Sequence, residues 1–325
     1  MRDRLSPPLI LLQLSTKKIR RFLYAHSTDA TYLEEPIAGG LLLGPRVQEF
    51  GQLFDHVPPE PHAQRLVDSF FQNVNWQFGI PENWFMRTYH QMWTILQCSP
   101  QQHWGSRLNP NWVSLFFAIL ALAPCSPVDE NSMEDKEPHE IYFRCAITAR
   151  YIAEGVFLEE PSSSIMVSAA DGTVLSCLAA PLLCTYLAER GHASEAWKLV
   201  GKAICAATAI GMHQDPGWPY WQVMSEEEKL LRRRAWWGLF IWDRWVAERL
   251  SHSRPLEPYH RLYSYILGRP YILRKDFSDV EYPIEDALLS QNIFSVGQVA
   301  LIRLAEIVGE AIDKASPIGL INVIF

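Results

Sequence analysis

The charged and nucleophilic residues of this chain do not fall into the spacing of a common catalytic site. Ten histidines and six cysteines are spread over 325 residues, without the H-E-x-x-H or paired C-x-x-C patterns of zinc sites. The G-x-S-x-G motif of hydrolases and the glycine-rich loops that bind nucleotide phosphates are also missing. The sequence therefore predicts no catalytic residues, no cofactor-binding residues and no metal ligands in this chain.

One basic triplet, Arg232–Arg234, has the composition of a phosphate or DNA contact. Three glutamates, Glu226–Glu228, precede it, and the i,i+4 spacing of a helix pairs Glu228 with Arg232. Alternating charges on one helix are typical of a solvated face. We interpret the triplet as part of a helix-surface charge lattice.

Two further pairs of charged residues stand out, and the first could suggest an acid pair or a metal site. Asp276 and Asp279 lie in "RKDFSDVEYP", an extended segment with two basic residues before it, where aspartates cap turns and form ion pairs. Asp243 and Arg244 end a tryptophan-rich run. A buried ion pair there would fix packing, because burying charges is costly unless they are well hydrogen-bonded.

Composition indicates a globular protein with a sizeable core. Hydrophobic residues make up 48% and charged residues 20%, and the net charge of −7 argues against nucleic-acid binding by bulk electrostatics. No apolar run approaches the ~18 residues of a membrane span. The dispersed cysteines fit reduced, buried thiols of an intracellular protein, and Cys184 and Cys205 lie in apolar helical stretches where they would act as small hydrophobes.

Apolar periodicity predicts an all-α fold, a multi-helical bundle or array of αα-hairpins without a significant sheet. Residues 1–60 carry proline, glycine and turn signals and are expected to form an irregular leader. The last long helix should bury Ile302, Ala305 and Ile307, and Ser225 with Glu228 fits a capping box. Helices are predicted from about residue 61 onward, including 66–76, 111–122, 138–157, an αα-hairpin turning at Gly191–His192, 225–244 and 286–314.

The runs "EEEKLLRRRAWWGLFIWDR" and "LYSYILGRPYILRKDFSDVEYP" together resemble the fungal-specific transcription factor domain. This is the middle homology, or regulatory, region of binuclear zinc-cluster regulators. "AICAATAIGMHQDP" and "LVDSFFQNVNW" are similar to two of its other helices, so the resemblance covers about residues 61–315. The matched signature residues are Arg232–Arg234, Trp236, Trp237, Phe240, Asp243, Arg244, Ser264, Leu267, Gly268, Arg269, Pro270, Asp276, Asp279, Val280 and Pro283.

The resemblance implies a nuclear, non-enzymatic regulator that responds to a small-molecule effector or to transcription co-regulators. Zinc and DNA are bound in the family by an N-terminal six-cysteine cluster, and residues 1–60 contain no cysteine. We therefore expect DNA contact only through a zinc-cluster domain missing from this chain, and no membrane partner; a homodimer stays open. The alternative is an all-helical small-molecule-binding or scaffold protein without a direct role in transcription.

Residues 245–261, "WVAERLSHSRPLEPYHR", interrupt the family pattern, and the apolar tail 316–325 follows the domain. Without the interruption, Arg244 joins Leu262 in a continuous match. Codon choices at Trp245–Val246 and His260–Arg261 allow splice donor and acceptor sequences at an interval divisible by three. A retained in-frame intron and a real loop insertion both fit. As protein, the first residues could extend the preceding helix by one or two turns, and His252 and His260 are assigned no function.

Overall fold

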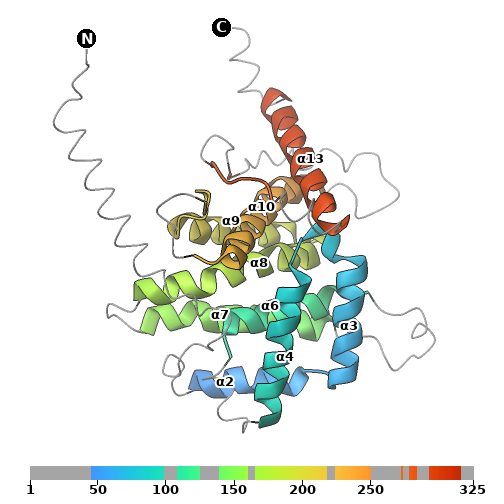
Figure 1. Cartoon of the computed structure of the whole chain (residues 1–325), viewed down its shortest axis with the longest axis vertical. Coiled ribbons are helices and arrows are strands. Elements are labelled where there is room, and N and C mark those ends of the chain that lie inside the picture. The colour runs from blue at the N-terminus through green and yellow to red at the C-terminus, as the bar shows by residue number, and fades with distance from the viewer. Residues whose placement is uncertain are drawn as a thin grey trace, which may run out of the picture.

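The computed structural model describes residues 45–98, 108–124, 139–159, 165–217, 224–249, 272–273, 278–283 and 293–315. Within these ranges 81% of residues are helical and no strand occurs (Figure 1). The predicted all-α class is confirmed. The elements are α2 (Pro45–Leu53), η1 (Phe54–His56), α3 (Glu60–Asn73), η2 (Asn75–Gln77), α4 (Glu82–Cys98), α6 (Pro110–Leu122), α7 (His139–Glu159), α8 (Ile165–Glu189), α9 (Ala193–Ala209), α10 (Glu226–Arg249) and α13 (Ile293–Ala315).

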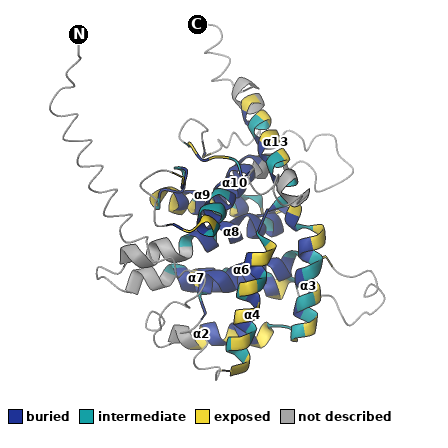
Figure 2. Cartoon of the chain, in the orientation of Figure 1, coloured by how far each residue is buried: buried dark blue, intermediate teal, exposed yellow. Residues whose placement is uncertain are grey.

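Helix α6 lies at the centre of the molecule. Every residue from 110 to 121 is buried, as expected for a stretch that is apolar on all sides. Asn109 caps the helix by accepting a hydrogen bond from the main-chain N–H of Asn111 at 2.9 Å. α3, α7 and α8 pack around α6, and the buried Ser114 hydroxyl donates to the carbonyl of Ala146 on α7 at 2.8 Å. Figure 2 shows this buried centre between helices that are exposed on their outer sides.

The predicted αα-hairpin is confirmed as α8 and α9. Gly191 takes a φ of 82° in the turn, a conformation that side chains disfavour. Small buried residues on α9 let the helices approach closely, so the Cys184 thiol reaches the carbonyl of Ala196 at 3.3 Å. Burial raises the pKa of Cys184 to about 12, which keeps this thiol protonated and unreactive. Cys205 differs from the prediction, because it lies on the exposed side of α9.

The sequence predicted an irregular leader over residues 1–60, but part of this stretch is helical in the structure. Residues 45–53 form α2, and Phe50, Leu53 and Phe54 are buried in the core. Pro45 stands at the first position of the helix, where its missing N–H costs no hydrogen bond. The proline and glycine signals that suggested a leader therefore mark a helix start in this segment.

Helix α13 lies at one edge of the molecule and packs against α10 and η2 (Figure 1). Ile302 and Ala305 are buried as predicted. Ile307 is not, because 64% of its surface is exposed. It belongs to a second apolar face of the helix that points away from α10.

Candidate functional site

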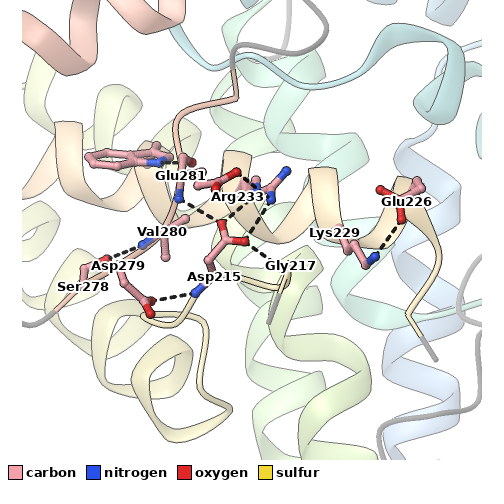
Figure 3. Close-up of polar contacts among 10 residues, drawn as sticks. Asp215, Gly217, Glu226, Lys229, Arg233, Ser278, Asp279, Val280 and Glu281 are labelled. Carbon is pink, nitrogen blue, oxygen red and sulfur yellow. Dashed lines mark hydrogen bonds and ion pairs between the residues drawn. The ribbon is translucent and has the colours of Figure 1, made fainter. Parts of the chain in front are cut away.

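The start of α10 follows the predicted capping pattern. The hydroxyl of Ser225 accepts a hydrogen bond from the main-chain N–H of Glu228 at 3.1 Å. Glu226, Glu227 and Glu228 lie in the first turn, where the helix dipole favours negative charge. At the surface Lys229 donates to Glu226 at 2.6 Å (Figure 3). This cap fixes the rotation of α10, and with it the directions of the three arginines that follow.

The predicted pair of Glu228 with Arg232 forms, but it does not lie at the surface. Arg232 donates from Nε to Glu228 at 3.2 Å, and the two side chains are only 2% and 10% exposed. Arg234 is also buried. The interpretation of the triplet as a surface charge lattice is therefore wrong. The neighbouring helices and loops cover this side of α10, so the charges face protein rather than water.

Arg233 makes the central contact of the site. Its guanidinium forms a two-pronged ion pair with Asp215, from Nε to Oδ2 and from Nη2 to Oδ1, both at 2.9 Å (Figure 3). The Arg233 side chain is 11% exposed and that of Asp215 is 9% exposed. A second carboxylate, that of Glu281, accepts from Nη2 at 3.2 Å and stays 68% exposed. Planar, bidentate pairing is the strongest geometry available to arginine.

Asp215 also holds two main-chain segments, and we call this set of contacts the Asp215 cluster. It accepts from the N–H of Gly217 at 2.6 Å and from the N–H of Glu281 at 2.9 Å. Asp279 accepts in turn from the N–H of Asp215 at 2.8 Å, a contact across 64 residues and not the local turn cap that the sequence predicted. Trp237 donates from its indole to the carbonyl of Glu281 at 2.9 Å. The cluster joins the end of the α9 region, α10 and segment 278–283.

The electrostatics of this cluster favour the ionised carboxylate. Burial alone would raise the pKa of Asp215, but hydrogen bonds from Arg233, Glu281 and Gly217 outweigh it and hold the pKa below its usual value. A group in this state does not exchange protons near neutral pH. It binds the three segments as a permanent anion.

Arg234 anchors a second junction, between α10, the turn after η2 and α13. Its Nη1 donates to the carbonyl of Gly79 at 2.8 Å and to Oε1 of Gln298 at 3.2 Å. Gln298 is fully buried and donates to the carbonyl of Phe78 at 3.0 Å. Gly79 has a φ of 68°, and a Cβ there would overlap the Gln298 amide. The close approach of α13 to this turn therefore requires glycine.

Asp243 and Arg244 are buried as predicted, and both contact the main chain of residues 272–273. Asp243 accepts from the N–H of Ile272 at 2.8 Å and from the N–H of Leu273 at 2.6 Å. Arg244 donates to the carbonyl of Leu273 at 3.0 Å and stacks on the ring of Phe240 at 3.5 Å. Burial raises the pKa of Asp243 against the lowering effect of these hydrogen bonds. Both side chains therefore hold the main chain of residues 272–273 against α10.

These contacts are internal to the fold. In the described ranges no three histidine, cysteine or acidic side chains gather in a way that could hold a metal ion. None of the helices placed by the structure is both long and apolar enough to cross a membrane. α10 continues to Arg249, so the first residues of the 245–261 interruption extend the helix as anticipated. Ser264, Leu267–Pro270, Asp276, His252 and His260 lie outside the described residues.

Three partners in these junctions were not identified from the sequence. Asp215 belonged to the "HQD" ending of a helix but had no assigned partner, and neither Gly79 nor Gln298 was singled out. A lone glycine followed by an apolar residue and a proline signals a turn, but not the residue that packs on it. Of the signature positions, Arg233, Trp237 and Asp279 meet in the Asp215 cluster, and Asp243 and Arg244 hold residues 272–273.

Comparisons with known proteins agree with this arrangement. The family model described as "Fungal specific transcription factor domain" matches residues 67–262. An uncharacterized transcriptional regulatory protein of Schizosaccharomyces pombe is 30% identical over 165 residues. That alignment covers 46% of this chain and 23% of the relative. No solved structure matches the chain significantly. The chain belongs to the fungal-specific transcription factor domain family.

Proposed function

We propose that this chain is the regulatory domain of a zinc-cluster-type transcription factor and that it acts in the nucleus without catalysing a reaction. The observation that carries the proposal is the family match over residues 67–262, together with the internal use of the signature arginines. Families of this kind regulate through contacts and conformation. The largely buried ion pair of Arg233 with Asp215 holds separate segments together, which suits a role in regulation.

DNA contact is assigned to another domain of the same regulator. The net charge of −7 repels phosphate, and the basic triplet is directed at Glu228, Asp215, Gly79 and Gln298. Zinc belongs with that other domain as well. This chain would then pass a signal to it, received from a small-molecule effector or from a transcription co-regulator.

Tethering the chain to a promoter tests this function. The full chain is fused to a heterologous DNA-binding domain and expressed with a reporter gene that carries the matching operator. We expect reporter output to differ from that of the DNA-binding domain alone at equal protein level. A fusion carrying Asp215→Ala, which removes the ion pair with Arg233 and destabilises the fold, is the negative control, and its output should approach that of the DNA-binding domain alone. Equal output with and without the chain, across nutrient and drug conditions, would support the scaffold alternative instead.

The nuclear assignment has its own measurement. A fluorescent fusion of the full-length protein should concentrate in the nucleus of fungal cells. Purified chain should show no specific binding to duplex DNA in fluorescence anisotropy at physiological salt. Tight and sequence-specific binding of DNA by this chain alone would contradict the proposal that another domain contacts the DNA.

A further inference from the structure

The outer face of α13 carries an apolar stripe that the described residues cover only beside Gly297. Leu304 is 43% exposed and Ile307 is 64% exposed. Ala300 is exposed one turn before Leu304, and Gly297 lies one turn further back beside Trp76, which is itself 41% exposed. Figure 2 shows exposed and half-buried residues along this helix at the edge of the molecule.

This stripe has the same alternating spacing as the buried face and lies on another side of the helix. Positions 297, 300, 304 and 307 follow each other at intervals of three, four and three residues, which is the a/d pattern of a two-helix seam. The inward face is formed by Gln298, Ile302, Ala305 and Gly309, all buried. There the helix approaches α10 so closely that a Cβ at Gly309 would touch the Arg244 guanidinium. One side of α13 therefore packs against α10, and the other side presents an apolar stripe with the spacing of a two-helix seam.

The charges beside the seam select its partner. With Gly297 and Leu304 at a, the g positions are Arg303 and Glu310, both exposed and of opposite sign. In an antiparallel pair of identical helices, g faces g, so Arg303 of one copy meets Glu310 of the other on both sides of a two-fold axis. The same register places Leu304 opposite Ile307. A parallel, in-register pair would place Arg303 against the apolar e position Val308 instead.

We propose that α13 is a self-association surface, through which two copies of this chain pair in antiparallel fashion. The self-complementary charge pattern favours a second copy over an unrelated helix. Arg303 already contacts Tyr282 and Glu306, yet its side chain stays 57% exposed and within reach of a partner. A seam of one helix per copy is small, so the dimer is expected to have a dissociation constant on the order of micromolar. This inference goes beyond the regulatory role and does not depend on it.

Sedimentation velocity over about 1–200 µM protein tests the proposal, with the mass of one chain, 37.3 kDa, as the reference. The wild type should shift toward the dimer as concentration rises. Ile307→Asp should weaken dimerisation at least about tenfold, because a charge replaces a side chain at the centre of the seam. Ile141→Asp on α7 is the matched control, since Ile141 is 43% exposed and lies off the seam. It should leave dimerisation unchanged.

Charge reversal tests the antiparallel register separately. Glu310→Arg and Arg303→Glu should each weaken self-association by bringing like charges together. The double variant should recover the wild-type behaviour, and an equimolar mixture of the two single variants should form heterodimers. Far-UV circular dichroism melts confirm that each variant is folded. A monomer at every concentration, or a dimer that Ile307→Asp leaves intact, would overturn the proposal. Single reversals without effect would refute this antiparallel seam.

Discussion

Replacing Asp215 by alanine removes the acceptor on which the Asp215 cluster is built. Arg233 loses both of its 2.9 Å hydrogen bonds, and the main-chain N–H groups of Gly217 and Glu281 lose theirs. The guanidinium keeps its contact to Glu281 at 3.2 Å. The substitution therefore leaves a largely buried cation without its bidentate partner.

The size of the effect follows from burial. Removing one member of a buried ion pair costs about 3–5 kcal/mol, and each buried amide left without an acceptor adds about 1–3 kcal/mol. Water can reach part of this site, because Arg233 is 11% exposed, and Glu281 shares its charge. We expect Asp215→Ala to lower the free energy of unfolding by about 3–4 kcal/mol. Arg233→Ala should cost less, since Asp215 keeps its two main-chain donors.

Equilibrium denaturation in urea, followed by tryptophan fluorescence, measures both variants. A double-mutant cycle with Asp215 and Arg233 isolates their coupling, expected at about 1–3 kcal/mol. Arg87→Ala is the matched control, because Arg87 pairs with Glu227 at the surface with 58% of its side chain exposed and should cost less than about 1 kcal/mol. If Asp215→Ala costs no more than Arg87→Ala, the cluster does not hold the three segments together.

Three other perturbations have defined outcomes. Folding lowers the pKa of Asp215, so its carboxylate stabilises the fold fully at pH values above the pKa of the unfolded chain, and this stabilisation is lost as pH falls through the pKa of the folded protein. Below about pH 4 the wild type should therefore lose more stability than Asp215→Asn. Gly79→Ala should cost at least about 2 kcal/mol in denaturation, from positive φ and overlap with a buried amide. Gly191 also has a positive φ, but a Cβ there would meet no atom within 4 Å, so Gly191→Ala should lower the free energy of unfolding by about half as much. Equal losses for the two variants would mean that the overlap with Gln298 contributes nothing. Deleting residues 245–261 should raise the free energy of unfolding by about 0.7 kcal/mol, because the connection between α10 and residue 272 shortens from 22 residues to ten. The retained-intron proposal predicts transcripts that lack this stretch, and reads that retain it as the major form would contradict it.

Local patterns predicted the helices because their causes are local. The apolar run of α6, the turn at Gly191 and the Ser225 cap each depend on residues within a few positions of one another. The same holds for the pairing of Glu228 with Arg232, four residues apart. Where neighbours along the helix decide the structure, spacing alone was sufficient.

Burial and long-range partners could not be predicted in this way. Spacing pairs Glu228 with Arg232 whether water or protein covers them, so a buried pair was mistaken for a surface lattice. Arg233 meets Glu281 across 48 residues, and Gln298 meets Phe78 across 220. Ile307 was assigned to the core because α13 is apolar on two faces, and periodicity does not say which one the body covers.

Native-state hydrogen exchange tests most directly the claim that the Asp215 cluster holds separate segments of the fold together. The amides of Gly217 and Glu281 donate to Asp215, so the account predicts that both exchange slowly in the wild type. In Asp215→Ala both should exchange much faster, while the amides of α6 stay protected under native conditions. Rapid exchange of these two amides in the wild type, or no change in the variant, would contradict the account.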